Sequence, residues 1–161
     1  MDWRKVKVVF TDFDGVLTDN RVLTSQSGEE FLYANKSDGI AIKDLKKHGI
    51  EVIIISSDLN STVLKRAEKI KTKAFNGVEN KGELIEELLV SLKLDKSNSL
   101  FIGNDINDLE AYNSVGIFCS TLDAFYSVRL HSDYVVPVKG GDGVLRELSQ
   151  IINYKMKQNG N

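Results

Sequence analysis

The chain has 161 residues, of which 42% are hydrophobic and 27% charged, so it is long enough to bury one core and has the composition of a globular protein. Its formal net charge of −2 provides no basic field for nucleic acid, and its single cysteine excludes an internal disulfide and a cysteine-cluster metal site. The sequence has neither a signal h-region at its start nor an apolar run that approaches the length of a bilayer, so we expect a cytoplasmic protein that binds no membrane.

The first apolar run, Val8 to Phe10, predicts a buried strand, and the sequence TDFDG follows it. Residues i and i+2 of an extended chain point to the same side, so Asp12 and Asp14 can converge on one ligand. Two adjacent carboxylates repel each other, and a divalent cation such as Mg²⁺ relieves that repulsion. Aspartate and glycine are also common in turns, so this stretch by itself is equally compatible with a simple turn.

Two short strand-like pieces, 21–24 and 30–33, flank the turn-rich sequence SQSG and predict a β-hairpin at about 20–36. The hairpin is too short to form a separate cap domain. We expect a helix to follow it, capped by Ser37 or Asp38 and continuing through Lys47.

A second buried strand, Glu51 to Ile55, is expected to end at Ser56, Ser57 and Asp58, before a helix that continues through Ile70. In α/β proteins anions bind where a strand ends and a helix begins, because free backbone N–H groups point there. The two serines are therefore candidates to bind a phosphoryl group, although helix capping explains them at least as well.

Asn80 is expected to cap a helix from Lys81 to Leu92, with Glu83 completing a capping box. Lys81 then lies in the first turn, where the helix dipole opposes a cation. This placement suggests an anionic partner for Lys81, and the alternative is an ordinary surface lysine.

A third buried strand, 99–102, is expected to end in the sequence GNDIND. Asn104, Asp105 and Asp108 would then place oxygen ligands at the same sheet edge as Asp12. Helix and loop capping by these residues is the alternative.

The rest of the chain repeats the alternation, with a strand at 115–119, a helix capped by Thr121 through about His131, a strand at 134–136 and a helix from about Asp142. This order predicts an α/β fold with a doubly wound, mainly parallel, Rossmann-like sheet and a short β-hairpin insertion. We expect a single domain over residues 1–154 and a frayed tail at 155–161.

The sequence DFDGVLTD resembles the first signature of the haloacid dehalogenase superfamily. It is most similar to a small branch that contains phosphatases of 3-deoxy-octulosonate 8-phosphate and nonulosonate 9-phosphate, and the C-terminal domain of acylneuraminate cytidylyltransferases. The resemblance spans nearly the whole chain and implies that Asp12 is the nucleophile and Asp14 the general acid and base. It also implies phosphate binding by Ser56, Ser57 and Lys81, and Mg²⁺ binding by Asp12, Asp14, Asn104, Asp105 and Asp108.

The resemblance also bears on the substrate and on assembly. Many relatives carry aspartate where this chain has Asn104, and a neutral amide binds Mg²⁺ more weakly than a carboxylate. Asp58 is acidic as in the nonulosonate phosphatases, and Arg66 is by analogy a candidate for binding the substrate carboxylate.

The branch is typically tetrameric, so the resemblance implies a homotetramer. The glycine-rich segment 139–143 resembles one that reaches a neighbouring subunit's site.

The sequence therefore predicts a Mg²⁺-dependent phosphatase of a small phosphorylated keto-deoxy sugar acid that works through an aspartyl-phosphate. Two functions of another class stay open: a non-catalytic oligomerisation domain, which Asn104 favours, and a phosphate-responsive receiver-like module. The joint presence of Asp14, Ser56 and Lys81 favours the phosphatase over both.

Overall fold

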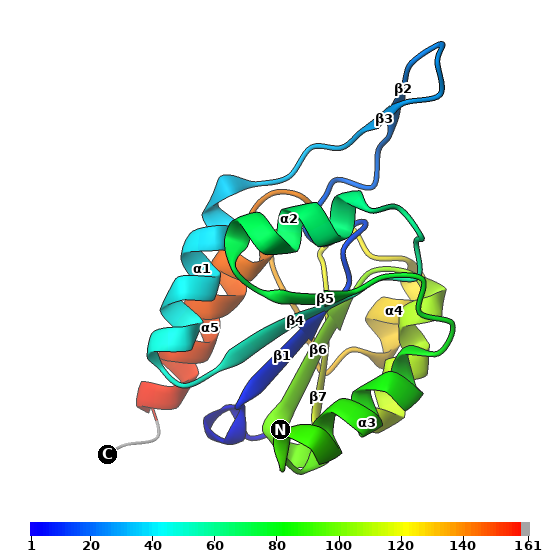
Figure 1. The fold of residues 1–161 in the computed structure, drawn as a ribbon. Helices are drawn as coiled ribbons and strands as arrows, with labels where there is room; N and C mark the ends of the chain where they lie inside the picture. The colour runs from blue at the N-terminus through cyan, green and yellow to red at the C-terminus, as the bar shows by residue number, and fades with distance from the viewer. Residues whose placement is uncertain (159–161) are drawn as a thin grey trace.

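The computed structural model describes residues 1–158 and contains a six-stranded parallel sheet with helices on both faces (Figure 1). The strands are β1 (Val8–Thr11), β4 (Glu51–Ile55), β5 (Lys73–Phe75), β6 (Ser99–Gly103), β7 (Ile117–Ser120) and β8 (Tyr134–Val135). They lie in the order β5-β4-β1-β6-β7-β8, so the chain fills one half of the sheet and then crosses to the other side of β1. The predicted doubly wound sheet is confirmed, and ligands of such sheets bind where the strand order reverses.

The sheet separates two hydrophobic cores. Val9 of β1 packs into one core with the helices α1 (Lys36–Lys47), α2 (Thr62–Ile70) and α5 (Val144–Gln158). Val8 and Phe10 pack into the other core with α3 (Lys81–Leu92), the 3₁₀ helix η3 (Ile106–Ser114) and α4 (Tyr126–His131). Because successive strand residues point to opposite faces and both faces are covered, the central strands are apolar except at their ends, where Thr11, Glu51 and Ser99 lie.

The hairpin is present but shorter than predicted, with β2 (Leu23–Thr24) paired antiparallel to β3 (Glu30–Phe31). Figure 1 shows it projecting from the body of the protein beyond the carboxyl end of the sheet. Two short 3₁₀ helices, η1 (Trp3–Lys5) and η2 (Lys96–Asn98), complete the described elements. Every helix within residues 1–158 is too short or too polar to cross a lipid bilayer.

Several helix boundaries differ from the predictions. The N-cap of α1 is Asn35, whose side chain accepts a hydrogen bond from the Ser37 N–H, and not Ser37 or Asp38. Helix α4 begins after Phe125 and not at Thr121, and η3 was not predicted. Helix α5 continues through Gln158, so the predicted frayed tail is helical at 155–158, and residues 159–161 lie outside the described part of the chain.

Asp38 is a buried carboxylate that joins α1 to the beginning of α5. Its Oδ1 accepts hydrogen bonds from the N–H groups of Leu145 (3.1 Å) and Arg146 (3.3 Å), while Oδ2 has no hydrogen-bond partner among residues 1–158. Burial raises the pKa of Asp38 to about 6, although these hydrogen bonds act in the opposite direction.

The raised pKa of Asp38 predicts a pH-dependent stability. Between about pH 4 and pH 6 the folded state binds more protons than the unfolded state, so this group lowers stability as the pH rises. Asp38→Asn keeps the acceptor oxygen and removes the titration. We compare the free energy of unfolding of Asp38→Asn with that of the wild-type protein. The variant's value relative to wild type should be on the order of 2–3 kcal/mol higher at pH 8 than at pH 4. Urea unfolding of both proteins at the two pH values measures this shift, and an equal difference at both would contradict it.

Candidate active site

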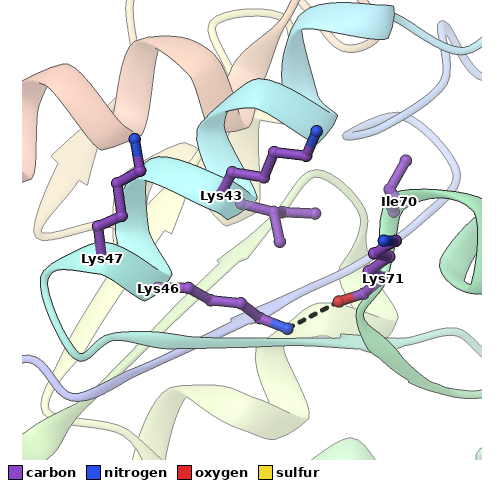
Figure 2. A pocket seen from close by; sticks show the side chains of 6 residues that line it. Lys43, Lys46, Lys47, Ile70 and Lys71 are labelled. Atoms are coloured by element: carbon purple, nitrogen blue, oxygen red, sulfur yellow. Dashed lines mark hydrogen bonds between the residues drawn. The ribbon is translucent and has the colours of Figure 1, made fainter.

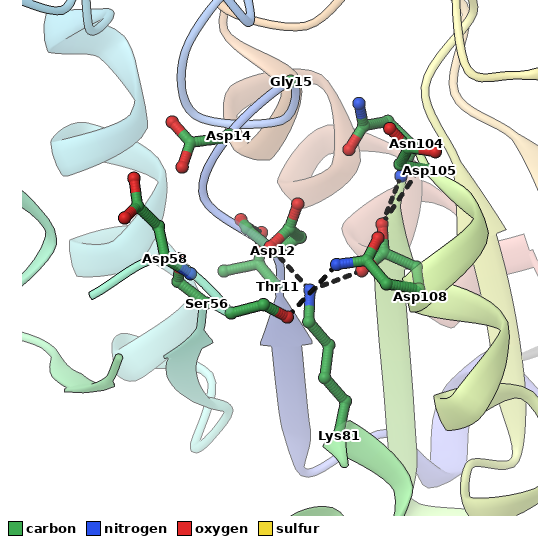
Figure 3. A network of polar contacts seen from close by, with 12 residues as sticks. Thr11, Asp12, Asp14, Gly15, Ser56, Asp58, Lys81, Asn104, Asp105 and Asp108 are labelled. Atoms are coloured by element: carbon green, nitrogen blue, oxygen red, sulfur yellow. Dashed lines mark hydrogen bonds and ion pairs between the residues drawn. The ribbon is translucent and has the colours of Figure 1, made fainter. Parts of the chain in front are cut away.

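The residues that follow β1 and β6 lie side by side at the carboxyl edge of the sheet (Figure 3). Thr11 pairs with Ile102 in the parallel register, and the Asp12 N–H donates to the Ile102 carbonyl (2.9 Å). This pairing places Asp12 next to Asn104, two residues beyond Ile102. The parallel sheet therefore brings together side chains that lie about ninety positions apart in the sequence.

Lys81 is fully buried and bridges two carboxylates. Its Nζ lies 2.7 Å from Asp12 Oδ1 and 2.6 Å from Asp108 Oδ1. Burial alone lowers the pKa of Lys81, but the charges and hydrogen bonds of Asp12 and Asp108 outweigh it, and the pKa is raised overall. Lys81 is therefore a charged member of an internal network and not a surface lysine.

The beginning of α3 holds Lys81 in this position. Asn80 caps the helix by accepting from the Glu83 N–H (3.2 Å), as predicted. The Lys81 N–H donates to Glu110 Oε2 of η3 (3.1 Å), and a side chain at Gly82 would collide with the Glu110 carbonyl. Glu110 was not among the predicted residues, because nothing in the local sequence pattern links η3 to α3.

Asp12 lies in an environment that opposes its ionisation. Burial and the nearby charge of Asp108 raise the pKa of Asp12 to about 7, although Lys81 acts to lower it. A carboxylate nucleophile must be ionised, so Asp12 needs more positive charge nearby than Lys81 alone supplies.

Asn104 completes a set of oxygen atoms next to Asp12. The end of its amide that faces Asp12 and Asp14 lies 2.9 Å from the main-chain oxygen of Asp14 and 3.2 Å from Asp12 Oδ2. Both neighbouring oxygens are hydrogen-bond acceptors, so the amide NH₂ group can occupy this position and donate to them. Alternatively, the amide oxygen can occupy it if a cation lies among the three oxygens. Adjacent oxygen ligands of octahedral Mg²⁺ lie about 3 Å apart, so the residues fit this ion.

The groups that could bind a metal ion in this set are one carboxylate, one main-chain carbonyl and one amide. Within residues 1–158 no group of three histidine, cysteine or acidic side chains could hold a metal ion, so a cation at this site would depend on the amide and main-chain oxygens as well as on Asp12. Gly15, at φ +80°, lets the chain approach Asn104, because a Cβ there would lie 2.0 Å from the Asn104 amide.

Asp105 and Asp108, which the resemblance implied as metal ligands, make other contacts. Asp108 Oδ1 accepts from Lys81, and Oδ2 accepts from the N–H groups of Asn104 (2.7 Å) and Asp105 (3.1 Å). Asp105 caps η3 by accepting from the Ile106 N–H (2.6 Å). These contacts favour positioning roles, with Asp108 fixing both Lys81 and the loop that carries Asn104.

Asp14 lies at the open side of the network and is partly buried. Thr18 donates its hydroxyl to Asp14 Oδ1 (3.3 Å). Burial and the charge of Asp58 raise the pKa of Asp14. Figure 3 shows the Asp58 carboxylate directed toward Asp14. A raised pKa suits a carboxyl group that must hold a proton before it donates it.

The two serines after β4 face this network differently. Ser56 is buried, and its Oγ accepts from the Asp58 N–H (3.1 Å). Ser57 is exposed, and its Oγ accepts from the Asn107 amide (3.1 Å) across the opening. Asn107 was not among the predicted residues, although it lies within the GNDIND sequence predicted to follow a strand.

Arg66 is not part of the network. Its guanidinium donates to the Asn35 carbonyl (2.8 Å), and its side chain lines a pocket of about 340 Å³ together with Phe13 and Leu32. The candidate role of Arg66 in binding a substrate carboxylate therefore rests on the resemblance alone.

The glycine-rich segment 139–143 packs against the loop after β1 of its own chain. The Gly141 N–H donates to the Val16 carbonyl (3.0 Å), and the Gly140 N–H donates to Asp123 Oδ1 (2.9 Å). A Cβ at Gly140 would lie 2.2 Å from the Gly15 carbonyl, so only glycine fits. In this chain the segment supports the loop that carries Asp14, whereas the resemblance implied contact with a neighbouring subunit.

The sequence and the fold of this chain are similar to those of known hydrolases. Residues 75–148 match the family model of haloacid dehalogenase-like hydrolases. The chain is 29% identical over 148 residues to the 3-deoxy-D-manno-octulosonate 8-phosphate phosphatase KdsC of Escherichia coli, covering 91% of this chain and 79% of that protein.

Two solved structures extend the match to the whole fold. A protein of Streptomyces avermitilis described as a HAD family hydrolase has 33% identity and a TM-score of 0.89, covering 93% of this chain and 86% of that one. The 3-deoxy-D-manno-octulosonate 8-phosphate phosphatase of Moraxella catarrhalis, in complex with magnesium, phosphate and KDO, has 27% identity and a TM-score of 0.90, covering 96% and 89%. The chain belongs to the haloacid dehalogenase-like hydrolase family.

Proposed function

We propose that this protein is a Mg²⁺-dependent phosphatase that hydrolyses a phosphorylated keto-deoxy sugar acid through an aspartyl-phosphate. The observation that supports it most strongly is the buried contact of Lys81 with Asp12 and Asp108, next to Asp14 and Asn104. Burial of a charged lysine between two carboxylates costs desolvation free energy, and such buried charged groups cluster at functional sites.

In the proposed first step, a carboxylate oxygen of Asp12 attacks phosphorus and the bond from phosphorus to the substrate oxygen breaks. Asp14 donates its proton to the departing alkoxide, so the sugar leaves as a neutral alcohol. In the second step water attacks the phosphorus of the aspartyl-phosphate, Asp14 takes a proton from that water, and phosphate leaves Asp12.

The other residues manage charge and position. Ser56, Ser57 and Lys81 are proposed to bind the phosphoryl oxygens, where negative charge must be stabilised during transfer. Asp12, the main-chain oxygen of Asp14 and Asn104 would hold Mg²⁺, which when bound supplies further positive charge to those oxygens and favours the ionised form of Asp12.

Two relatives and one local feature support the proposed substrate class. Two of the proteins named above are 3-deoxy-D-manno-octulosonate 8-phosphate phosphatases. By the resemblance, Asp58 is acidic as in the nonulosonate phosphatases. We therefore propose a nonulosonate 9-phosphate or an octulosonate 8-phosphate as substrate, and a cytoplasmic location remains a prediction.

The experiment that tests this function is a phosphate-release screen. Purified protein is incubated with sugar acid phosphates of eight and nine carbons and with simple sugar phosphates, each with Mg²⁺ and with EDTA. We expect release from a keto-deoxy sugar acid phosphate that requires Mg²⁺. Release from none of the compounds would contradict the proposal and favour the non-catalytic oligomerisation domain.

Asn104 offers a test of the proposed metal site. Asn104→Asp adds a carboxylate to the oxygen set, so we expect the Mg²⁺ concentration for half-maximal activity to fall on the order of tenfold. Asp105→Asn is the matched control, because Asp105 caps η3, and it should change this concentration less than about twofold. Mg²⁺ titrations of activity that show the reverse pattern would assign the ligand role to Asp105.

We further propose a homotetramer in which neighbours cover the hairpin. Leu23, Phe31 and Tyr33 are exposed on or beside a two-stranded hairpin that projects from the body (Figure 1). Isolated two-stranded hairpins are marginally stable, and exposed apolar clusters mark interfaces.

Substitution of the exposed aromatic residues tests this assembly. We expect the double variant Phe31→Ser, Tyr33→Ser to dissociate the tetramer to monomers, as measured by light scattering during size-exclusion chromatography. Val90→Ser removes an equally exposed apolar side chain from α3 and should leave the tetramer intact. A monomeric wild-type protein would contradict the proposal.

A further inference from the structure

A second candidate site lies in a groove between the carboxyl-terminal ends of α1 and α2 (Figure 2). Buried Ile42 and Ile70 form its apolar floor, and four lysines, Lys43, Lys46, Lys47 and Lys71, form its rim. Its volume of about 490 Å³ lies within the range of small-molecule pockets.

This basic groove lies at the end of the sheet opposite to the candidate active site. Helix α1 ends just before β4 begins, whereas Ser56 follows the other end of β4. A molecule in the basic groove would therefore not contact Asp12 or Lys81.

Within residues 1–158, one of the four lysines of the basic groove forms an ion pair with an acidic side chain. Lys43 lies three positions before Lys46 and four before Lys47 on α1, and like charges at these spacings destabilise a helix. The ion pair joins Lys46 Nζ to Glu51 Oε2 at a distance of 4.0 Å. Both side chains are exposed, so the pair contributes little to stability. The protein as a whole carries a net charge of −2, so composition does not explain the cluster.

Helix dipoles explain only part of this arrangement. Lys46 and Lys47 lie in the last turn of α1, and Lys46 Nζ donates to the Lys71 carbonyl at the end of α2 (2.7 Å). Lys43 lies a full turn earlier and faces the same pocket as Lys47, so the helix terminus does not account for it.

We propose that the basic groove binds a nucleoside polyphosphate. Several ammonium groups around one pocket attract a multiply charged phosphate, which a single lysine would not select. Ile42 and Ile70 are already buried, so the apolar surface that the groove still exposes is that of the aliphatic lysine stems. A purely inorganic anion would leave these stems in water, whereas a nucleobase covers them.

Binding of ATP in the presence of EDTA, measured by calorimetry, tests this inference independently of catalysis. We expect a Kd for the wild-type protein of about 10–100 μM at low salt. The double variant Lys43→Gln, Lys47→Gln should bind at least about tenfold more weakly. The matched control Lys5→Gln, Lys7→Gln removes two exposed lysines elsewhere and should change the affinity less than about twofold.

The remaining outcomes decide the proposal. Equal losses in both double variants would indicate general charge attraction, and unchanged affinity in both would place ATP elsewhere, so either result overturns it. Tripolyphosphate should bind about tenfold more weakly than ATP because it lacks the base. Equal binding of the two compounds would overturn the assignment of a nucleoside body, and no ATP binding by the wild-type protein would overturn the site itself.

Discussion

Asp12→Asn is expected to lower phosphate release by at least about a thousandfold, because the amide cannot attack phosphorus. The substitution keeps the shape of the side chain and removes a carboxyl group whose pKa is raised by burial and by Asp108. Lys81 retains its contact with Asp108, so the fold should persist. Steady-state phosphate release gives the loss of activity, and a thermal melt gives the state of the fold.

Asp14→Asn is the matched control for this prediction, because it removes the proposed proton donor and leaves the nucleophile in place. Rapid quenching followed by mass measurement should detect a phosphate adduct on the Asp14→Asn protein and none on the Asp12→Asn protein. Turnover by Asp12→Asn at the wild-type rate would exclude the aspartyl-phosphate mechanism.

Lys81→Met should be the most destabilising single change in the site. It removes the cation between Asp12 and Asp108 and leaves two buried carboxylates facing each other. Loss of one partner from a buried ion pair costs about 3–5 kcal/mol of unfolding free energy, and we expect a loss of this size at pH 8 in EDTA. Phosphate release should also be lost, because the phosphoryl oxygens lose their proposed cationic ligand.

The destabilisation by Lys81→Met should depend on pH. Without the lysine the pKa of Asp12, about 7 in its presence, rises further, so the folded variant binds more protons than the unfolded chain. Its stability therefore falls as the pH rises, and the deficit should shrink between pH 8 and pH 5.

Lys93→Met, at the exposed end of the same helix, is the control for Lys81→Met. It should change stability by less than about 0.5 kcal/mol at either pH. Urea unfolding curves provide all of these values, and a deficit of Lys81→Met that is independent of pH would contradict the buried ion network.

The sequence by itself determined the parallel sheet and the edge at which the site lies. Continuous apolar runs such as residues 52–55 can be recognised locally, because a strand covered on both faces is apolar along its buried length. The limits of α3 were also predicted, because Asn80 and the helix periodicity act within a few residues. Asp12 and Asp14 follow a strand whose position in the middle of the sheet comes from the βαβ alternation.

Only the tertiary structure decided which partner each charged side chain found. Lys81 meets Asp108, 27 positions away, and Asp38 meets the beginning of α5, 107 positions away, although the sequence predicted Asp38 to cap its own helix. Arg66 likewise contacts Asn35 and stays outside the network. Local propensity depends on neighbours within about one helical turn, whereas these partners meet because packing of both helical layers on the sheet removes them from water together.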